Sequence, residues 1–139
     1  MSAVESEHDE RIFDLIGGGM AVTTAVALAA AGYFVFESAV YGAVAGLFVG
    51  IGSYLFLPWF LRLSAVQEGS DEEVSGTAAV ERVSGNPQTS VLGAGLEMGG
   101  IAMFAAGFVT EKPDLLVGVP AAIAVALAVF LVGSVLLPE

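Results

Sequence analysis

Four long stretches of this sequence are almost free of charge, and they constrain the fold more than any other feature. Residues 15–36, 38–61 and 115–138 carry no charged side chain, and residues 83–110 carry one, Glu97. A helix rises about 1.5 Å per residue, so roughly 20 residues cross a hydrocarbon core of about 30 Å. Each stretch is therefore long enough to form a transmembrane helix.

The composition also indicates that the chain needs lipid as its solvent. Hydrophobic residues make up 56% of the 139 positions, charged residues make up 14%, and the mean hydropathy is +0.84. Soluble domains carry roughly 25% charged residues. The few charges here are gathered in short segments between the apolar stretches. We therefore expect an all-α integral membrane protein, a four-helix bundle made of two helical hairpins.

The expected organisation is an acidic tail, four spans and one sizeable aqueous linker. The boundaries are 1–14 for the tail, 15–36 and 38–61 for the first two spans, 62–90 for the linker, and 91–110 and 115–137 for the last two spans. The third span is counted back from Thr110, and a re-entrant or interfacial segment is the alternative there. In the linker, Ser70 and Glu73 have the spacing of a capping box, which predicts a short surface helix over 71–83. Asn86-Pro87 predicts a turn before the third span.

The basic residues predict how the chain lies in the cell membrane. The N-terminal segment is acidic, unlike the basic start of a signal peptide, so the first span is expected to stay in the protein. Arg11, Arg62 and Arg82 flank one side of the membrane, and Lys112 lies in the loop on the other side. The positive-inside rule then places both termini and the linker in the cytoplasm.

The formal net charge of −11 comes from 15 acidic residues against four basic ones. This acidity, a single lysine, the abundant Ala, Gly and Val, and the span pattern resemble small, uncharacterised multi-pass membrane proteins of haloarchaea. The resemblance implies that the charge is a solubility adaptation to molar salt, where the Debye length is about 3 Å. It implies no activity and no site residue. The alternative is that the linker binds cations or a basic partner.

The lipid bilayer is the one partner that the sequence demands. Four aromatic side chains lie near span ends, as an aromatic belt requires: Tyr33, Tyr41, Trp59 and Phe60. A homo-oligomer or a larger membrane complex is left open. Nucleic acid and anionic lipid are poor candidates because the sequence has no positive patch.

Two short matches suggest an internal duplication. Residues 30–37 resemble 105–111, and residues 52–58 resemble 133–138, each with one residue skipped and in the same order. Each half would hold two spans, so the repeat would be a parallel one. Chance matching of frequent Ala and Gly is the alternative.

Small residues at helical spacing predict close helix packing. Gly42, Gly46 and Gly50 lie on one face of the second span, Gly95 and Gly99 on one face of the third. The first span has its own stripe of Gly19, Thr23, Ala27 and Ala31. If a glycine face formed a homo-oligomer, Gly46→Leu would disrupt it. The favoured alternative is that the second span's stripe meets the first span within the hairpin, because only a tight turn joins them.

Chemistry-bearing side chains are scarce. Glu97 is the one ionisable residue inside a span, and intramembrane acids are candidate ion or proton sites. A position near the helix N-terminus would instead make it an interfacial, structural residue. There is no cysteine, and the sole histidine, His8, lies in the tail, so we expect no metal, cofactor or catalytic residue.

Three functional interpretations follow. The leading one is a non-enzymatic accessory or self-associating membrane module. The alternative is a small transporter or channel that uses Glu97 as an ion or proton site. The weakest is a membrane enzyme, which would need a cluster of polar groups at one membrane depth.

Overall fold

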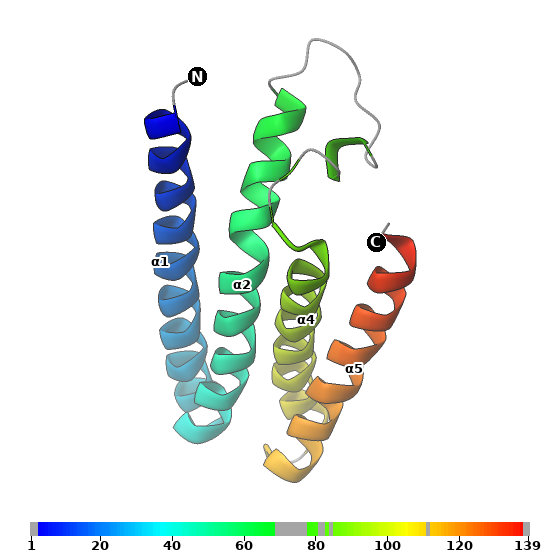
Figure 1. Cartoon of the computed structure of the whole chain (residues 1–139). Coiled ribbons are helices and arrows are strands. Elements are labelled where there is room, and N and C mark those ends of the chain that lie inside the picture. The colour runs from blue at the N-terminus through cyan, green and yellow to red at the C-terminus, as the bar shows by residue number, and fades with distance from the viewer. Residues whose placement is uncertain (1–2, 69–77, 81–82, 84, 111, 138–139) are drawn as a thin grey trace.

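The computed structural model is built of four long helices. It describes residues 3–68, 78–80, 83, 85–110 and 112–137, with the backbone alone for 3–10. The helices are α1 (Ala3–Phe36), α2 (Ala39–Glu68), α4 (Pro87–Val109) and α5 (Leu115–Leu136). Among these described residues there is no strand. The predicted all-α bundle of two hairpins, α1–α2 and α4–α5, is confirmed (Figure 1).

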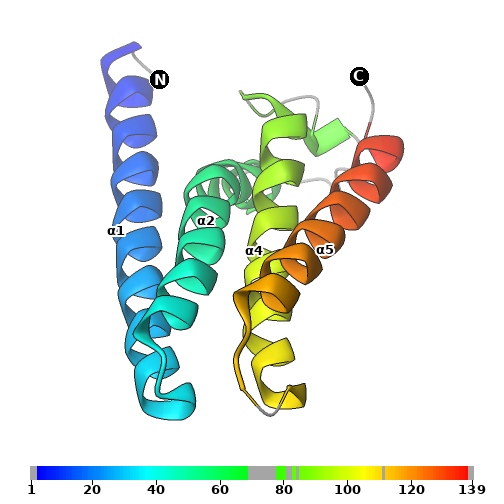
Figure 2. The same cartoon turned by 90° about the horizontal axis from the view of Figure 1, so that it is seen from below.

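The four helices pack in chain order as a row. The main contacts join α1 to α2, α2 to α4 and α4 to α5. Figures 1 and 2 both place α1 and α5 at the two ends of this row. The helices run alternately in opposite directions, so the start of α1 and the end of α5 lie at the same end of the molecule (Figure 1). The outer helices therefore have a helical neighbour on one side, and the inner helices on two.

Three helices extend beyond the spans that the sequence predicted. α1 begins in the acidic tail at Ala3, α2 continues to Glu68, and α4 begins at Pro87. The apolar runs report only the part of each helix that lipid can cover, and a helix can continue into water. At α4 the Asn86 side chain accepts a hydrogen bond from the Gln88 N–H at 2.9 Å, and Pro87 occupies the first turn. The Asn86-Pro87 turn is thus the N-cap of the helix.

The linker is described in part. The predicted surface helix over 71–83 falls mostly outside the described residues, of which 78–80 are helical. Ala79 and Val83 are both buried.

A tight turn closes the first hairpin. Glu37 adopts a left-handed conformation with φ 55°, and the Ser38 hydroxyl accepts the Tyr41 N–H at 3.3 Å. In the second hairpin, Asp114 caps α5 by accepting the Leu116 N–H at 2.8 Å. Both turns are short, which forces consecutive helices to pack as neighbours.

The matched segments of the suggested duplication do not have matching neighbours. A Cβ on Gly32 would contact Gly42 of its own hairpin, whereas one on Gly107 would contact Phe36 and Tyr41 of the other hairpin. The duplication stays a hypothesis.

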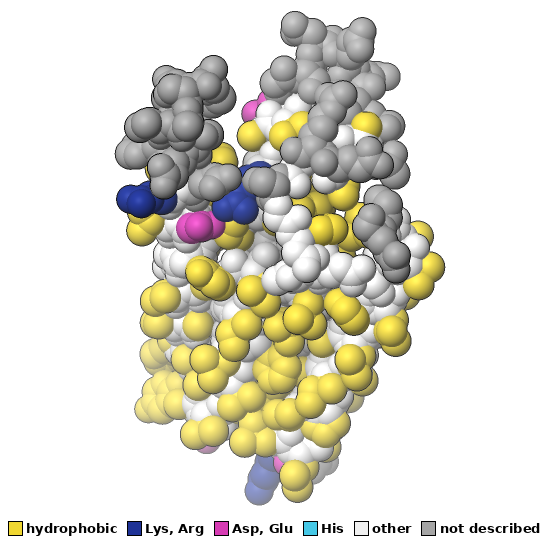
Figure 3. All heavy atoms as spheres, in the orientation of Figure 1, with side chains coloured by type: hydrophobic (Ala, Val, Ile, Leu, Met, Phe, Trp, Pro, Cys, Tyr) yellow, Lys and Arg dark blue, Asp and Glu magenta, His cyan; other side chains and the backbone are white. Residues whose placement is uncertain are grey.

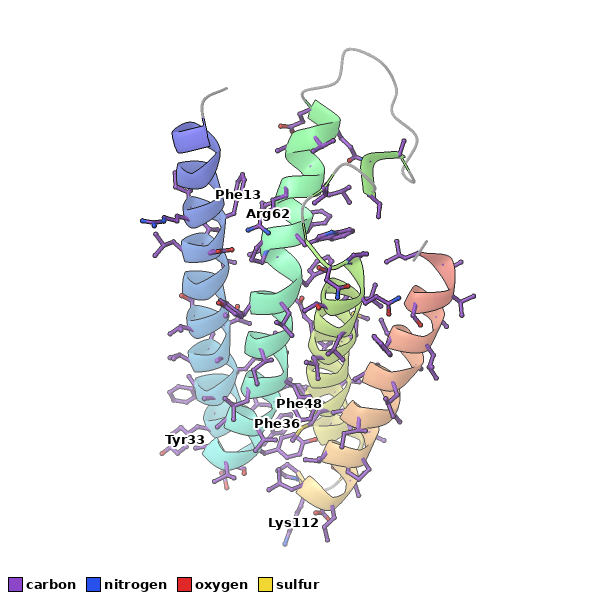
Figure 4. The ribbon with its side chains drawn as sticks, in the orientation of Figure 1. Phe13, Tyr33, Phe36, Phe48, Arg62 and Lys112 are labelled. Atoms are coloured by element: carbon purple, nitrogen blue, oxygen red, sulfur yellow. The ribbon has the colours of Figure 1, made fainter. Side chains whose placement is uncertain are left out.

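The surface shows an apolar belt between two polar ends. On the face drawn in Figure 3, apolar side chains cover the middle of the molecule, and charged side chains lie above and below them. Figure 4 places Arg62 and Lys112 at opposite ends. Each of the four helices is long enough and apolar enough to cross a bilayer.

Candidate functional site

The glycine face of α2 is covered by α1. A Cβ placed on Gly42 would lie 2.5 Å from the Leu28 carbonyl oxygen, and one on Gly46 would lie 2.6 Å from that of Ala25. At Gly50 the Ala21 carbonyl oxygen would be 3.0 Å away. Real Cβ atoms essentially never approach backbone closer than 3.0 Å, so Gly42 and Gly46 need glycine, whereas at Gly50 the neighbouring backbone would have to shift by a few tenths of an ångström. In this fold the face is used within the hairpin, and a second copy of the chain cannot reach it.

The glycine face of α4 is used in the same way against α5. A Cβ on Gly95 would lie 2.6 Å from the Ala126 carbonyl oxygen, and one on Gly99 would clash with that of Ala122. Ala122 and Ala126 are buried. The two helices of each hairpin therefore pack in the same way, with glycines of the inner helix against the alanine-rich backbone of the outer helix.

The two hairpins meet along α2 and α4 through further glycines. A Cβ on Gly52 would lie 2.5 Å from the Glu97 nitrogen and 2.6 Å from the Gly93 carbonyl oxygen. One on Gly100 would lie 2.8 Å from the Ala45 carbonyl oxygen. We did not predict this interface, and the spacing of seven between Gly93 and Gly100 is the sequence signal for it.

Tyr41 of α2 also connects the two hairpins, because its buried side chain bonds to α4. Its side chain is 1% exposed, and its hydroxyl donates a hydrogen bond to the Met103 carbonyl on α4. The ring packs edge-on against Phe36 in an aromatic cluster with Phe104 and Phe108. The prediction that Tyr41 belongs to the aromatic belt is wrong, because its ring points into the protein. Tyr33, by contrast, is 59% exposed.

Glu97 lies in the middle of α4 and not near its start. Because α4 begins at Pro87, Glu97 is ten residues along it, or about 15 Å. The favourable effect of a helix N-terminus on an acid is confined to the first turn, so it does not account for this residue. Glu97 is half-buried, and its backbone packs on Gly52. No hydrogen bond or ion pair joins its carboxylate to another described residue.

A pocket lies where α1, α2 and the start of α4 meet. Its volume is about 230 Å³, and it is lined by Asp14, Tyr54, Leu55, Pro58, Trp59, Arg62, Gly85, Asn86, Thr89 and Ser90. Arg62 Nη2 pairs with Asp14 Oδ1 at 3.1 Å and so connects α2 to α1. Figure 4 shows Arg62 projecting from α2 on the side of α1.

Two of the residues that line this pocket each hold a buried hydrogen-bond donor that has no partner among the described residues. These donors are the indole Nε1 of Trp59 and the Nε of Arg62, both shielded from solvent. Gly85 has φ +130° and packs beside both residues, since a Cβ there would lie 3.5 Å from Trp59 Cδ1 and 3.9 Å from Arg62 Nη1. From the sequence, Trp59 was predicted to be part of the aromatic belt, and Arg62 was used only to predict the orientation of the chain in the membrane. Nothing in the sequence indicated that Asp14, 48 residues away, pairs with Arg62.

These features define a multi-pass helical membrane protein, with four helices long and apolar enough to cross a bilayer. No protein-family model, no curated protein and no solved structure matches the chain. Within the described ranges, no group of three or more His, Cys, Asp or Glu residues could hold a metal ion.

Proposed function

We propose that this protein is a non-enzymatic membrane module that associates with a second copy of itself through the outer face of α1. The observation that carries the proposal is a small-residue stripe on α1 that does not face α2. Nothing lies within 4 Å of a Cβ built on Gly19, and Thr23 and Ala27 are exposed. The Thr23 hydroxyl donates to the Gly19 carbonyl at 2.8 Å, so the stripe presents no free hydroxyl proton to lipid.

A second copy suits this face for three reasons. Helices in lipid associate mainly by close van der Waals packing at small residues. The chain already closes both of its hairpins in this manner, at Gly46 and at Gly99. As an outer helix, α1 can also meet the same stripe of a second copy about a two-fold axis, which gives a closed dimer.

Gly19→Leu is expected to weaken self-association at least tenfold while leaving the monomer folded. The leucine would fill the groove that the second α1 needs, but it meets open space within one chain. Energy transfer between labelled copies in liposomes measures the dimer fraction.

The matched control is Ala128→Leu, which enlarges an exposed small residue on the other outer helix, α5. It should leave the dimer fraction unchanged. Equal dimerisation of Gly19→Leu and the parent chain, or an equal loss in the Ala128 variant, would remove α1 as the interface.

We further propose that both termini face the cytoplasm and that the acidic surface is an adaptation to high salt. Arg11, near the start of α1, and Arg62, near the end of α2, lie at the same end of the molecule, where Arg62 pairs with Asp14, and this supports the orientation. Arg82 lies outside the described residues. In a parallel dimer the two acidic tails would repel each other. Association is therefore expected to strengthen as salt is added, because salt screens that repulsion.

A second candidate function is ion or proton transport through Glu97. The supporting observation is a half-buried glutamate at mid-helix whose carboxylate has no partner among the described residues. Glu97→Gln is then expected to abolish proton or cation flux in proteoliposomes without unfolding the protein. Glu37→Gln, at an exposed turn, is the control. Flux that is unchanged in the Glu97 variant, or absent from the parent chain, would exclude this role.

A further inference from the structure

Glu97 lies well inside the apolar belt, as its two neighbouring helices show. Its backbone packs against Gly52, which lies far from both ends of the uncharged run 38–61 of α2. On the other side, the glycines two residues before and after Glu97 pack against positions 126 and 122, within the uncharged run 115–138 of α5. At about 1.5 Å per residue, Glu97 is roughly 13 Å inside the nearer end of each run. Since half of a hydrocarbon core is about 15 Å, this glutamate lies near its middle.

The Glu97 carboxylate can be reached from outside the chain. No hydrogen bond or ion pair joins it to another described residue. Its oxygens are also not among the side-chain atoms that are buried without a partner, unlike the donors of Trp59 and Arg62. Charged side chains in hydrocarbon are costly, and in membrane proteins they generally pair with another charged or polar group. The carboxylate therefore favours a cationic partner at the same depth.

A helix-packing seam that no other helix of the chain fills runs along α4 beside Glu97. Five positions of α4 alternate by four and three residues, which is the spacing of a seam that packs on one neighbouring helix. They are Ala94, Met98, Ile101, Ala105 and Phe108, here called the α4 seam. The last four are exposed, although α4 is an inner helix of the row with α2 and α5 as its main neighbours (Figures 1 and 2).

Glu97 belongs to the same side of the helix as this seam. It precedes Ile101 by four residues and follows Ala94 by three, and residues at these spacings are neighbours on a helix surface. The alanines of the seam have small side chains, which let the backbone of another helix approach closely. The α4 seam and Glu97 therefore suit a single helix that lies along α4.

A second copy of this chain does not supply the cation. Its basic residues all lie outside the uncharged runs, at Arg11, Arg62, Arg82 and Lys112. Two α4 seams that faced each other would bring two Glu97 carboxylates together, and like charges repel strongly in a medium of low dielectric constant. The partner that fits is a different protein.

We propose that the α4 seam binds a transmembrane helix of a different membrane protein, and that a Lys or Arg near the middle of this helix pairs with Glu97. The seam provides van der Waals packing, and the carboxylate selects a cationic helix over an apolar one. The site does not depend on self-association through α1. It is an alternative to transport through Glu97, which needs no second protein.

Model helices test the charge pairing. The full chain carries a donor dye on Ser64→Cys and is reconstituted in phosphatidylcholine liposomes with an acceptor-labelled helix of about 24 leucines and alanines. One version of this helix has a central lysine, and the control version has leucine there. Energy transfer is expected to show at least tenfold tighter binding of the lysine helix. Equal binding of the two helices, or no binding of the lysine helix, would overturn the proposal.

Variants test the carboxylate and the seam separately, with folding checked by circular dichroism. Glu97→Gln should abolish the preference for the lysine helix and leave energy transfer between two copies of the chain unchanged. Ala105→Leu, at an exposed position, should weaken binding of the lysine helix several-fold, because the larger side chain prevents close approach. Loss of association between copies in Glu97→Gln, or full binding by Ala105→Leu, would contradict the proposal.

A relocated acid is the matched control for position. Ala124 is exposed on α5 at the depth of Glu97, between the two alanines that face Gly95 and Gly99. The double variant Glu97→Gln, Ala124→Glu should bind the lysine helix several-fold less tightly than the parent chain, because the acid is no longer beside the α4 seam. Equal binding would show that any acid at this depth suffices and would overturn α4 as the docking face.

Crosslinking in the native membrane tests the identity of the partner. A photo-reactive phenylalanine analogue at Met98 is expected to capture a membrane span that contains a Lys or Arg, with at least a tenfold lower yield in Glu97→Gln. Capture of copies of this chain alone, capture of spans without a basic residue, or no capture would contradict the proposal.

Discussion

Gly46→Leu is expected to separate α1 from α2 and to lower the free energy of unfolding by roughly 3 kcal/mol. The added side chain has nowhere to go, because its Cβ alone would lie 2.6 Å from the Ala25 carbonyl oxygen and 3.1 Å from Ala25 Cα. Backbone cannot yield as a flexible side chain can, so the two helices must move apart. The measurement is unfolding in mixed detergent micelles, followed by circular dichroism.

The smaller change Gly46→Ala separates sterics from helix propensity. Alanine favours a helix over glycine by about 1 kcal/mol, so a loss of stability in this variant must come from the contact with α1. Gly18→Ala is the matched control, since a Cβ there meets only Tyr54 Cε2, at 4.0 Å, and Gly18 is not part of the stripe proposed for self-association. We expect the Gly46 variant to be destabilised and the Gly18 variant to be unchanged or more stable. Equal effects would contradict the hairpin packing.

The second large effect is expected from Gly52→Leu, which should part the two hairpins while leaving each intact. A Cβ there would meet the Glu97 nitrogen at 2.5 Å and the Gly93 carbonyl oxygen at 2.6 Å, both on α4. The expected loss of stability is again roughly 3 kcal/mol. Because the chain has no cysteine, nitroxide labels on cysteines introduced at Phe60 and Leu92 report the α2–α4 distance without interference.

That distance is expected to lengthen and broaden in Gly52→Leu. A second label pair within the first hairpin, at Ile12 and Phe60, should keep its distance, because Gly52 faces α4 and not α1. If the second pair also separated, the two hairpins would not be independent packing units. If neither pair moved, the α2–α4 interface described here would be wrong.

The sequence predicted the number, order and type of the helices well, because the requirement to cross lipid leaves little choice. In the hydrocarbon core of a bilayer, a run such as 115–138 must form a helix, because its backbone N–H and C=O groups have no water to bond to. It predicted helix ends less well. α1 begins and α2 ends in charged segments outside the apolar runs, where hydropathy carries no information, and the start of α4 depends on the Asn86 cap.

Helix partners were harder to predict than helix faces. The spacing of Gly42, Gly46 and Gly50 shows that they share a face, but an α1 of the same chain and a helix of another chain would satisfy it equally. The fold decides between them by placing Ala25 against Gly46. Tyr41 was misplaced for a related reason, since a tyrosine near a span end can point to the membrane surface or into the core. The pairing of Asp14 with Arg62 depends on tertiary structure alone.

Cysteine accessibility tests the central claim most directly, namely that four helices cross the membrane and bring both ends of the chain to one side. Single cysteines at Ser64 and Thr89, near the pocket end, and at Lys112, at the other end, are labelled in intact cells and in inverted vesicles with a membrane-impermeant maleimide. The account predicts that positions 64 and 89 react from one side and position 112 only from the other. Labelling of all three positions from the same side would contradict it.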